Sequence, residues 1–248
     1  MERDALEIAG LVKAFGGLLA VDGVSMRVPV GRRHALIGPN GAGKTTLFNC
    51  IAGTLMPTAG LVFLFGQEVT RRAEHRRAGL GLARTYQITN LFPGLTLLEN
   101  VLLAVHGTTR QKWVLHRPLE AFPESQARAA QELERVGLAR RAGEPVHRLS
   151  YGERRQLEFA LALASQPRAL LLDEPTAGLS PADRERIVST IAQVPRDITV
   201  LLIEHNMDVV LGLADRITVL HYGRVITEGT PEEVRANPQA REVYLGAA

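Results

Sequence analysis

The sequence predicts an α/β fold whose core is a mainly parallel sheet. In the second half of the chain, short apolar segments of strand length alternate with helical segments, which is typical of parallel strands joined by helices. A glycine-rich loop stands between an apolar strand at His34–Ile37 and a helix at Lys44–Ala52. The chain has 248 residues, 46% of them hydrophobic, so it is long enough to bury a sizeable core as one domain.

The N-terminal part predicts a small antiparallel β region. Alternation over Leu6–Ile8 and then Leu11–Phe15 predicts one strand, and Val21–Val30 is a further predicted strand that ends at a turn on Gly31. After the glycine-rich loop and its helix, Leu61–Phe65 predicts another strand.

The middle of the chain predicts a helical insertion, because prolines punctuate it and its apolar spacing is helical. The predicted elements here are a strand at Gly79–Ala83 and helices at Thr96–Val105 and Glu124–Val136. We expect one domain over residues 1–248, in which a helical subdomain at 88–160 is inserted into a core formed by 1–87 and 161–248.

The α/β alternation returns after the insertion. In chain order, the predicted elements are a helix at 154–165, a strand at 169–172, a helix at 181–193, a strand at 198–203, a helix at 206–213, strands at 216–220 and 225–228, and a helix at 231–236. Helices joining short apolar strands indicate a sheet that is covered on both faces.

Composition narrows the function classes. There are 29 basic and 26 acidic residues, a net charge of +3 with histidine neutral, and so weak a field argues against a nucleic-acid surface. No apolar run approaches the roughly 20 residues of a membrane-spanning helix, and the charged N-terminus does not have the pattern of a secretory signal. The single cysteine, Cys50, excludes an intramolecular disulfide and favours a reducing compartment.

The strongest motif is a phosphate-binding loop, which matches G-x-x-x-x-G-K-[ST] between a strand and a helix. Its glycines allow backbone N–H groups to point at one anion, and the helix N-terminus adds a partial positive charge. We expect Lys44 to reach the β- and γ-phosphates of a nucleotide and Thr45 to offer its hydroxyl to Mg²⁺. The loop comprises Gly38, Pro39, Asn40, Gly41, Ala42, Gly43, Lys44, Thr45 and Thr46.

Two further motifs stand at element ends. Asp173 and Glu174 follow an apolar strand, at the sheet edge where α/β proteins bind ligands. We expect Asp173 to hold Mg²⁺ through its water shell and Glu174 to polarise an attacking water. Ser150 and Glu153 form a capping-box pattern, which alone indicates only a helix start. Together with the N–H of Gly152, Ser150 could also face a second phosphate.

These motifs, in this order, resemble the ATP-binding cassette (ABC) transporter ATPases, and the resemblance spans residues 6–246. Leu149–Glu153 resembles the LSGGQ signature of that family, with Tyr151 for the second glycine and Glu153 for the glutamine. Both departures occur in the LivG-like ATPases of branched-chain amino acid importers. Further similarity to that subgroup lies at residues 84–87, 106–123, 229–232 and 241–246.

The resemblance implies roles for further residues. Gln87 would be a Mg²⁺ ligand at the hinge to the helical subdomain, and His205 would contact the γ-phosphate. Phe15 would stack on adenine, although the family more commonly has tyrosine there. The residues expected to contact the nucleotide of a second subunit are Ser150, Tyr151, Gly152 and Glu153, while Lys44, Glu174 and His205 would be the catalytic set.

The resemblance also implies a function. A dimer would sandwich two ATP molecules, hydrolyse them with Mg²⁺ and pass its closing motion to ABC permease subunits on the cytoplasmic, inner face of the cell membrane. The second ATPase could be identical or different, a substrate-binding protein would be an indirect partner, and no nucleic acid is expected. The cargo is expected to be branched-chain amino acids; the alternatives are a urea, aromatic-acid or lipopolysaccharide transporter. A non-transport ABC protein and a small-molecule kinase with the same loop are more distant alternatives.

Overall fold

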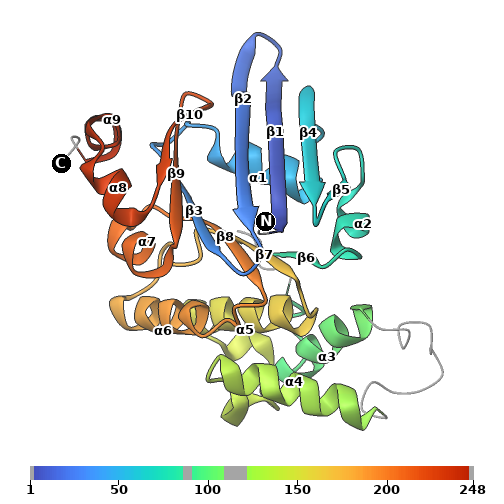
Figure 1. The fold of residues 1–248 in the computed structure, drawn as a ribbon. Helices are drawn as coiled ribbons and strands as arrows, with labels where there is room; N and C mark the ends of the chain where they lie inside the picture. Colours follow the sequence, from blue (N-terminus) through green and yellow to red (C-terminus); the bar gives the residue numbers. More distant parts are fainter. Residues whose placement is uncertain (1–2, 86–90, 109–121, 246–248) are drawn as a thin grey trace. The chain divides into compact units, whose positions relative to one another are not determined.

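Two sheets with a helix between them make up the first of two units in this computed structural model, which describes residues 3–85, 91–108 and 122–245 (Figure 1). The first unit spans residues 1–84, 168–174 and 195–248. The second spans 85–167 and 175–194 and is helical where the structure describes it. The predicted insertion, 88–160, falls within the second unit, which also takes in the later helix α6 (Pro181–Ala192).

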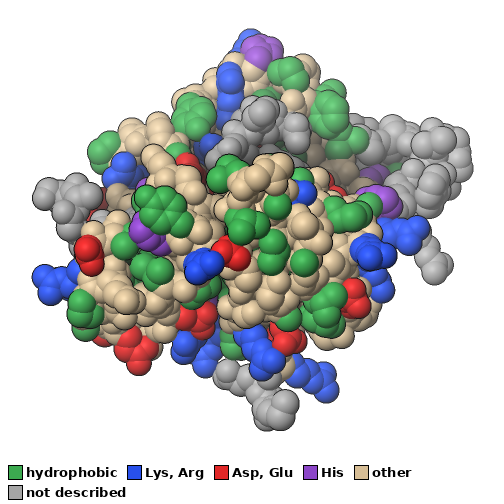
Figure 2. Space-filling model, turned by 90° about the horizontal axis from the view of Figure 1, so that it is seen from above, with side chains coloured by type: hydrophobic (Ala, Val, Ile, Leu, Met, Phe, Trp, Pro, Cys, Tyr) green, Lys and Arg blue, Asp and Glu red, His purple; other side chains and the backbone are tan. Residues whose placement is uncertain are grey.

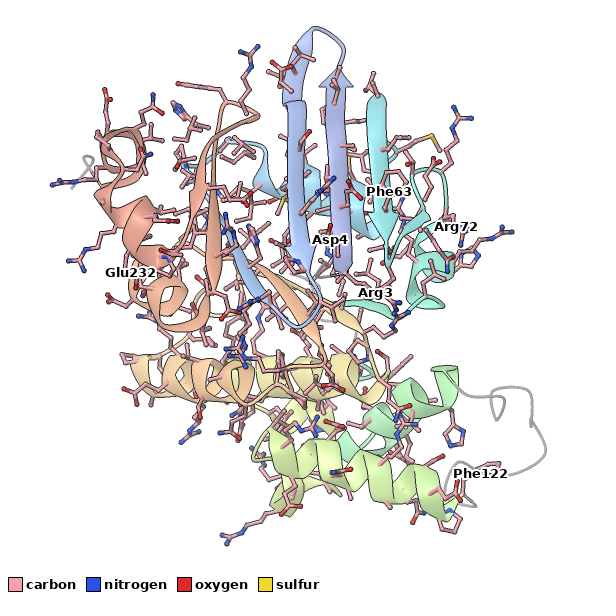
Figure 3. All side chains as sticks on the ribbon, viewed as in Figure 1. Arg3, Asp4, Phe63, Arg72, Phe122 and Glu232 are labelled. Carbon is pink, nitrogen blue, oxygen red and sulfur yellow. The ribbon has the colours of Figure 1, made fainter. Side chains whose placement is uncertain are left out.

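The first sheet is antiparallel, with the strand order β2-β1-β4-β5. The strand predicted over Leu6–Ile8 and Leu11–Phe15 is confirmed as one strand, in which a bulge at Gly10 (φ +57°) lets the pairing continue. Asp4 at the start of this strand and Phe63 in its neighbour mark the two strands in Figure 3. The strand bounds are β1 Asp4–Phe15, β2 Leu18–Pro29, β4 Ala59–Leu64 and β5 Gln67–Glu68.

The second sheet is mainly parallel, with the order β10-β9-β3-β8-β7-β6, and only β9 and β10 pair antiparallel. Every residue of β3, β7 and β8 is buried, as expected of parallel strands covered on both faces. The carboxyl ends of these three strands therefore meet at one edge. The strand bounds are β3 Arg33–Ile37, β6 Leu82–Arg84, β7 Ala169–Asp173, β8 Thr199–Ile203, β9 Arg216–His221 and β10 Arg224–Gly229.

Helix α1 (Lys44–Ala52) fills the space between the two sheets. Leu47, Phe48 and Ile51 have no exposed surface and join one core with residues of both sheets. The guanidinium of Arg77 caps this helix, donating to the carbonyls of Cys50 (2.7 Å) and Ile51 (2.6 Å). The other helices described in this unit are α2 Glu74–Ala78, α7 Met207–Leu213, α8 Pro231–Ala236, α9 Pro238–Ala240 and a π-helix at Arg241–Leu245.

Three predicted elements begin three residues away from their predicted start, and one of them, β2, begins at Leu18 rather than Val21. The strand predicted at Gly79–Ala83 begins only at Leu82, since Gly79 ends the unpredicted helix α2 and Gly81 has φ +97°. The helix predicted at 154–165 begins at Tyr151, because the capping box at Ser150 starts it there.

The second unit is a helical cluster in which α3 contacts α4 and α5, and α5 also contacts α4 and α6. Thr96 and Glu99 form a capping box at the start of α3: the N–H of Thr96 donates to Glu99 at 2.6 Å, and the N–H of Glu99 donates to the hydroxyl of Thr96 at 3.1 Å. The ring of Phe122, labelled in Figure 3, packs edge-on against His106 with centroids 5.0 Å apart. The remaining helices are α3 Leu97–Thr108, α4 Pro123–Arg135 and α5 Tyr151–Ala164, with 3₁₀ turns at Ala139–Arg141 and Val146–Arg148.

The described helices are all too short or too polar to cross a membrane. On the face in Figure 2, basic, acidic and apolar side chains are interspersed.

A buried histidine makes the stability of the first unit depend on pH. His34 on β3 is 0% exposed, and its Nε2 lies 2.7 Å from the hydroxyl of Thr218, which donates to Glu228. Burial, reinforced by Arg216, lowers the pKa of His34 to about 4. Because the unfolded chain binds this proton near pH 6.5 and the folded chain only near pH 4, protonation favours unfolding in that window.

We expect the free energy of unfolding to fall by about 2 kcal/mol between pH 7 and pH 5 on account of His34. His34→Gln should remove this part of the pH dependence in urea titrations. His75→Gln, an exposed histidine on α2, is the matched control and should keep it. An unchanged pH slope in His34→Gln would contradict the assignment.

Candidate nucleotide site

The glycine-rich loop joins β3 to α1 in a conformation that requires glycine at two positions. Gly43 precedes the helix with φ +98°, and a Cβ there would lie 2.1 Å from the carbonyl oxygen of Ala20. A Cβ on Gly38 would lie 2.1 Å from the carbonyl oxygen of Leu220. The loop is therefore held closely by β2 and β9, with the N-terminus of α1 at its end.

Lys44 places a cation over this loop. Its side chain is largely buried, and Nζ donates to the carbonyls of Gly38 (2.7 Å) and Pro39 (2.9 Å). Burial lowers the pKa of Lys44, and the nearby carboxylates of Glu174 and Asp173 act in the opposite direction. The ammonium group lies where a phosphate on the loop would be within its reach.

A cavity of about 400 Å³ opens beside the loop and gathers several of the predicted site residues. Phe15 from β1, Glu174 from the end of β7 and His205 from beyond β8 all line it. The loop residues on its wall are Asn40, Gly41, Ala42, Gly43, Lys44, Thr45 and Thr46. An aromatic ring, the backbone of the loop, a cation and a carboxylate thus line one cavity.

Sequence reasoning missed four apolar residues of this cavity: Leu18, Leu19, Ala20 and Tyr222. Tyr222 is 79% exposed. It is carried by a turn whose next residue, Gly223, donates to the carbonyl of Ala42 (2.9 Å) and accepts from the N–H of Asp22 (2.8 Å). These contacts join residues far apart in the chain, so no local pattern could have indicated Tyr222.

Glu174 and His205 form a pair at the sheet edge. Nε2 of His205 lies 2.7 Å from Oε1 of Glu174, and the N–H of Glu174 donates to the carbonyl of Ile203. Glu174 has φ +49°, a conformation rare for a residue with a side chain. Asn206 caps α7 by accepting from the N–H of Val209.

Asp173 is buried beside an arginine that sequence reasoning did not single out for this role. Its Oδ2 lies 2.9 Å from Nη2 of Arg84, whose Nη1 donates to Asn49 at 2.7 Å. Burial raises the pKa of Asp173, and Arg84 opposes that rise. Oδ1 is also buried but has no hydrogen-bond partner among the described residues.

The start of α5, in the second unit, carries the signature residues. Ser150 and Glu153 form both hydrogen bonds of a capping box, as predicted. The Tyr151 hydroxyl donates to the carbonyl of Ala177 at 3.4 Å and accepts from Nε of Arg155. A Cβ on Gly152 would lie 2.5 Å from the carboxyl carbon of Asp183, so a larger residue here would require the Asp183 side chain to move. Gln87, the remaining predicted site residue, lies outside the described residues.

A strand, phosphate loop and helix, with a carboxylate pair at the end of β7 two strands away in the same sheet, define a nucleotide-hydrolysing cassette. The sequence model for the family described as ABC transporter matches residues 21–177. This chain belongs to that family, as one of its ATPases, and the predicted fold class is confirmed.

Within this family, the chain is similar over its whole length to ATP-binding proteins of branched-chain amino acid transport. It is 42% identical to the high-affinity branched-chain amino acid transport ATP-binding protein BraF of Pseudomonas aeruginosa and 41% identical to LivG of Salmonella typhimurium, covering 100% of each chain. Residues 224–248 match a family described as branched-chain amino acid ATP-binding cassette transporter. A solved structure, the ADP conformation of the ATP-binding cassette MJ1267, superposes with a TM-score of 0.85 at 30% identity, covering 99% of both chains.

Proposed function

We propose that this chain hydrolyses ATP to power an importer of branched-chain amino acids. The observation that carries the proposal is the single cavity lined by the phosphate loop, Phe15, Glu174 and His205. The names of full-length relatives and the match of the C-terminal residues 224–248 support the cargo.

In this proposal each group has a defined part in hydrolysis. The loop N–H groups and Lys44 bind the phosphates, and the adenine lies against Phe15. Water attacks the γ-phosphorus while the bond to the bridging oxygen of ADP breaks, and Glu174 accepts the proton of that water. His205, hydrogen-bonded to Glu174, orients this carboxylate and contacts the γ-phosphate.

The residues near the phosphates fit Mg²⁺, which prefers oxygen ligands. Oδ1 of Asp173 is a buried carboxylate oxygen without a hydrogen-bond partner in the described part of the chain, and Thr45 lies on the phosphate loop of the same unit. Thr45, Asp173 and Gln87 would hold the ion. When bound, Mg²⁺ would neutralise charge on the β- and γ-phosphates.

The second unit would contact the nucleotide that a partner subunit binds. Ser150, Tyr151, Gly152 and Glu153 would contact the nucleotide held by the other ATPase, whether that is a second copy or a different chain. The segment 88–160 would form the helical subdomain that meets a permease at the inner face of the membrane. A substrate-binding protein would be an indirect partner.

Lys44→Ala is expected to abolish ATP hydrolysis by the purified chain, because no other side chain of the loop carries a positive charge. In a strain that lacks this gene, the wild-type chain should restore uptake of labelled leucine and Lys44→Ala should not. Wild-type hydrolysis by Lys44→Ala would refute the site. If the strain without the gene still takes up leucine fully but no longer takes up another solute, the proposed cargo is wrong while the ATPase assignment stands.

A further inference from the structure

The signature helix starts with an acidic residue where a phosphate would have to approach. Glu153 lies in the first turn of α5, and helix N-termini attract anions through a partial charge of about +0.5. A carboxylate of charge −1 there reverses the sign of the local field. A phosphate group brought to this helix start would meet repulsion unless something offsets Glu153.

Both oxygens of Glu153 are engaged by groups of the same unit. Oε2 accepts from the backbone N–H of Ser150 at 2.9 Å, and Oε1 accepts from Nη1 of Arg141. The carboxylate is thereby turned onto the capping box. The guanidinium of Arg141 also lowers the pKa of Glu153, so the acid is ionised and paired.

Arg141 is itself held in place for this contact. It ends the 3₁₀ turn Ala139–Arg141, and its Nη2 donates to Oε2 of Glu144 at 2.7 Å. Its side chain is 29% exposed and that of Glu153 is 23% exposed. Water screens this pair only in part, so the charge of Arg141 is felt at the helix start.

We propose that Arg141 is the positioning residue of the signature segment: it offsets the charge of Glu153 and fixes its carboxylate on the capping box, so that the helix start accepts the partner subunit's ATP. This inference rests on the proposed function. Arg141 does not touch the nucleotide in this scheme; it acts through Glu153.

The test is a rescue experiment on the ATP-dependent dimer, measured by analytical ultracentrifugation with ATP and Mg²⁺ in a Glu174→Gln background that retains ATP. Arg141→Gln should weaken the dimer about tenfold, because it leaves Glu153 uncompensated. Adding Glu153→Gln should recover most of that loss, since the amide can still cap Ser150 without a charge. Arg140→Gln removes the same charge from the neighbouring exposed position and should leave the dimer constant unchanged.

The outcomes distinguish a failure of the inference about Arg141 from a failure of the proposed function. Equal weakening in Arg141→Gln and in the double variant would overturn the electrostatic role, because a loss of loop structure is not rescued by removing a charge. A dimer unaffected by Arg141→Gln would overturn the inference while leaving the proposed function intact. Absence of any ATP-dependent dimer in the chain that retains Arg141 would contradict the proposed function, and the inference with it.

Discussion

Glu174→Gln is expected to slow ATP hydrolysis by about 10²–10⁴-fold while ATP binding persists. Glu174 is fixed at the cavity by two contacts: its backbone N–H donates to the carbonyl of Ile203, and its Oε1 lies 2.7 Å from Nε2 of His205. Glutamine keeps the shape and one hydrogen-bond acceptor but cannot take a proton from the attacking water. Because hydrolysis is what releases the dimer in this mechanism, the variant should accumulate as an ATP-bound dimer.

Two measurements check this expectation. Phosphate release gives the rate, and size-exclusion chromatography with ATP and Mg²⁺ gives the dimer. Glu68→Gln, an exposed residue of β5 in the same unit, is the matched control and should behave as wild type. Hydrolysis by Glu174→Gln at a near wild-type rate, with elution as monomer, would refute the role given to this carboxylate.

The elements that could be predicted are those whose causes are local in the sequence. Strands β7 and β8 are continuous apolar runs, and each is buried throughout. The phosphate loop was predictable because its glycines, lysine and flanking elements are contiguous. In contrast, α2 has five residues and depends on Arg77, whose side chain reaches back to the end of α1. No periodicity can be seen in so short a helix.

The predicted site was incomplete where it depends on contacts between distant residues. Arg84 and Asp173 are 89 positions apart, and Arg141 and Glu153 are 12 positions apart. Tyr222 reaches the cavity because its turn is bonded to Ala42 and Asp22. A single sequence contains each of these residues but not their pairing, since the pairing follows from how the strands of the first unit and the helices of the second pack.

The largest expected effect on stability comes from Arg84→Met. The Asp173 side chain is 0% exposed and that of Arg84 is 10% exposed, so this substitution leaves a buried carboxylate unpaired. Removing one partner of a buried ion pair typically costs about 3–5 kcal/mol. Asn49 also loses its hydrogen bond from Nη1. We expect urea unfolding at neutral pH to shift by an amount in this range.

The destabilisation caused by Arg84→Met depends on pH, because the carboxylate of Asp173 can be protonated. Burial already raises the pKa of Asp173 in the wild-type chain, and losing Arg84 raises it further. A raised carboxylate pKa stabilises the fold at low pH, and that stabilisation is lost as the pH rises. The loss of unfolding free energy in Arg84→Met, relative to wild type, should therefore be smallest near pH 4 and grow toward pH 7. Adding Asp173→Asn removes the buried charge and should recover part of the stability at pH 7. If the double variant were instead less stable than the sum of the two single changes predicts, the pair would not be the source of the effect.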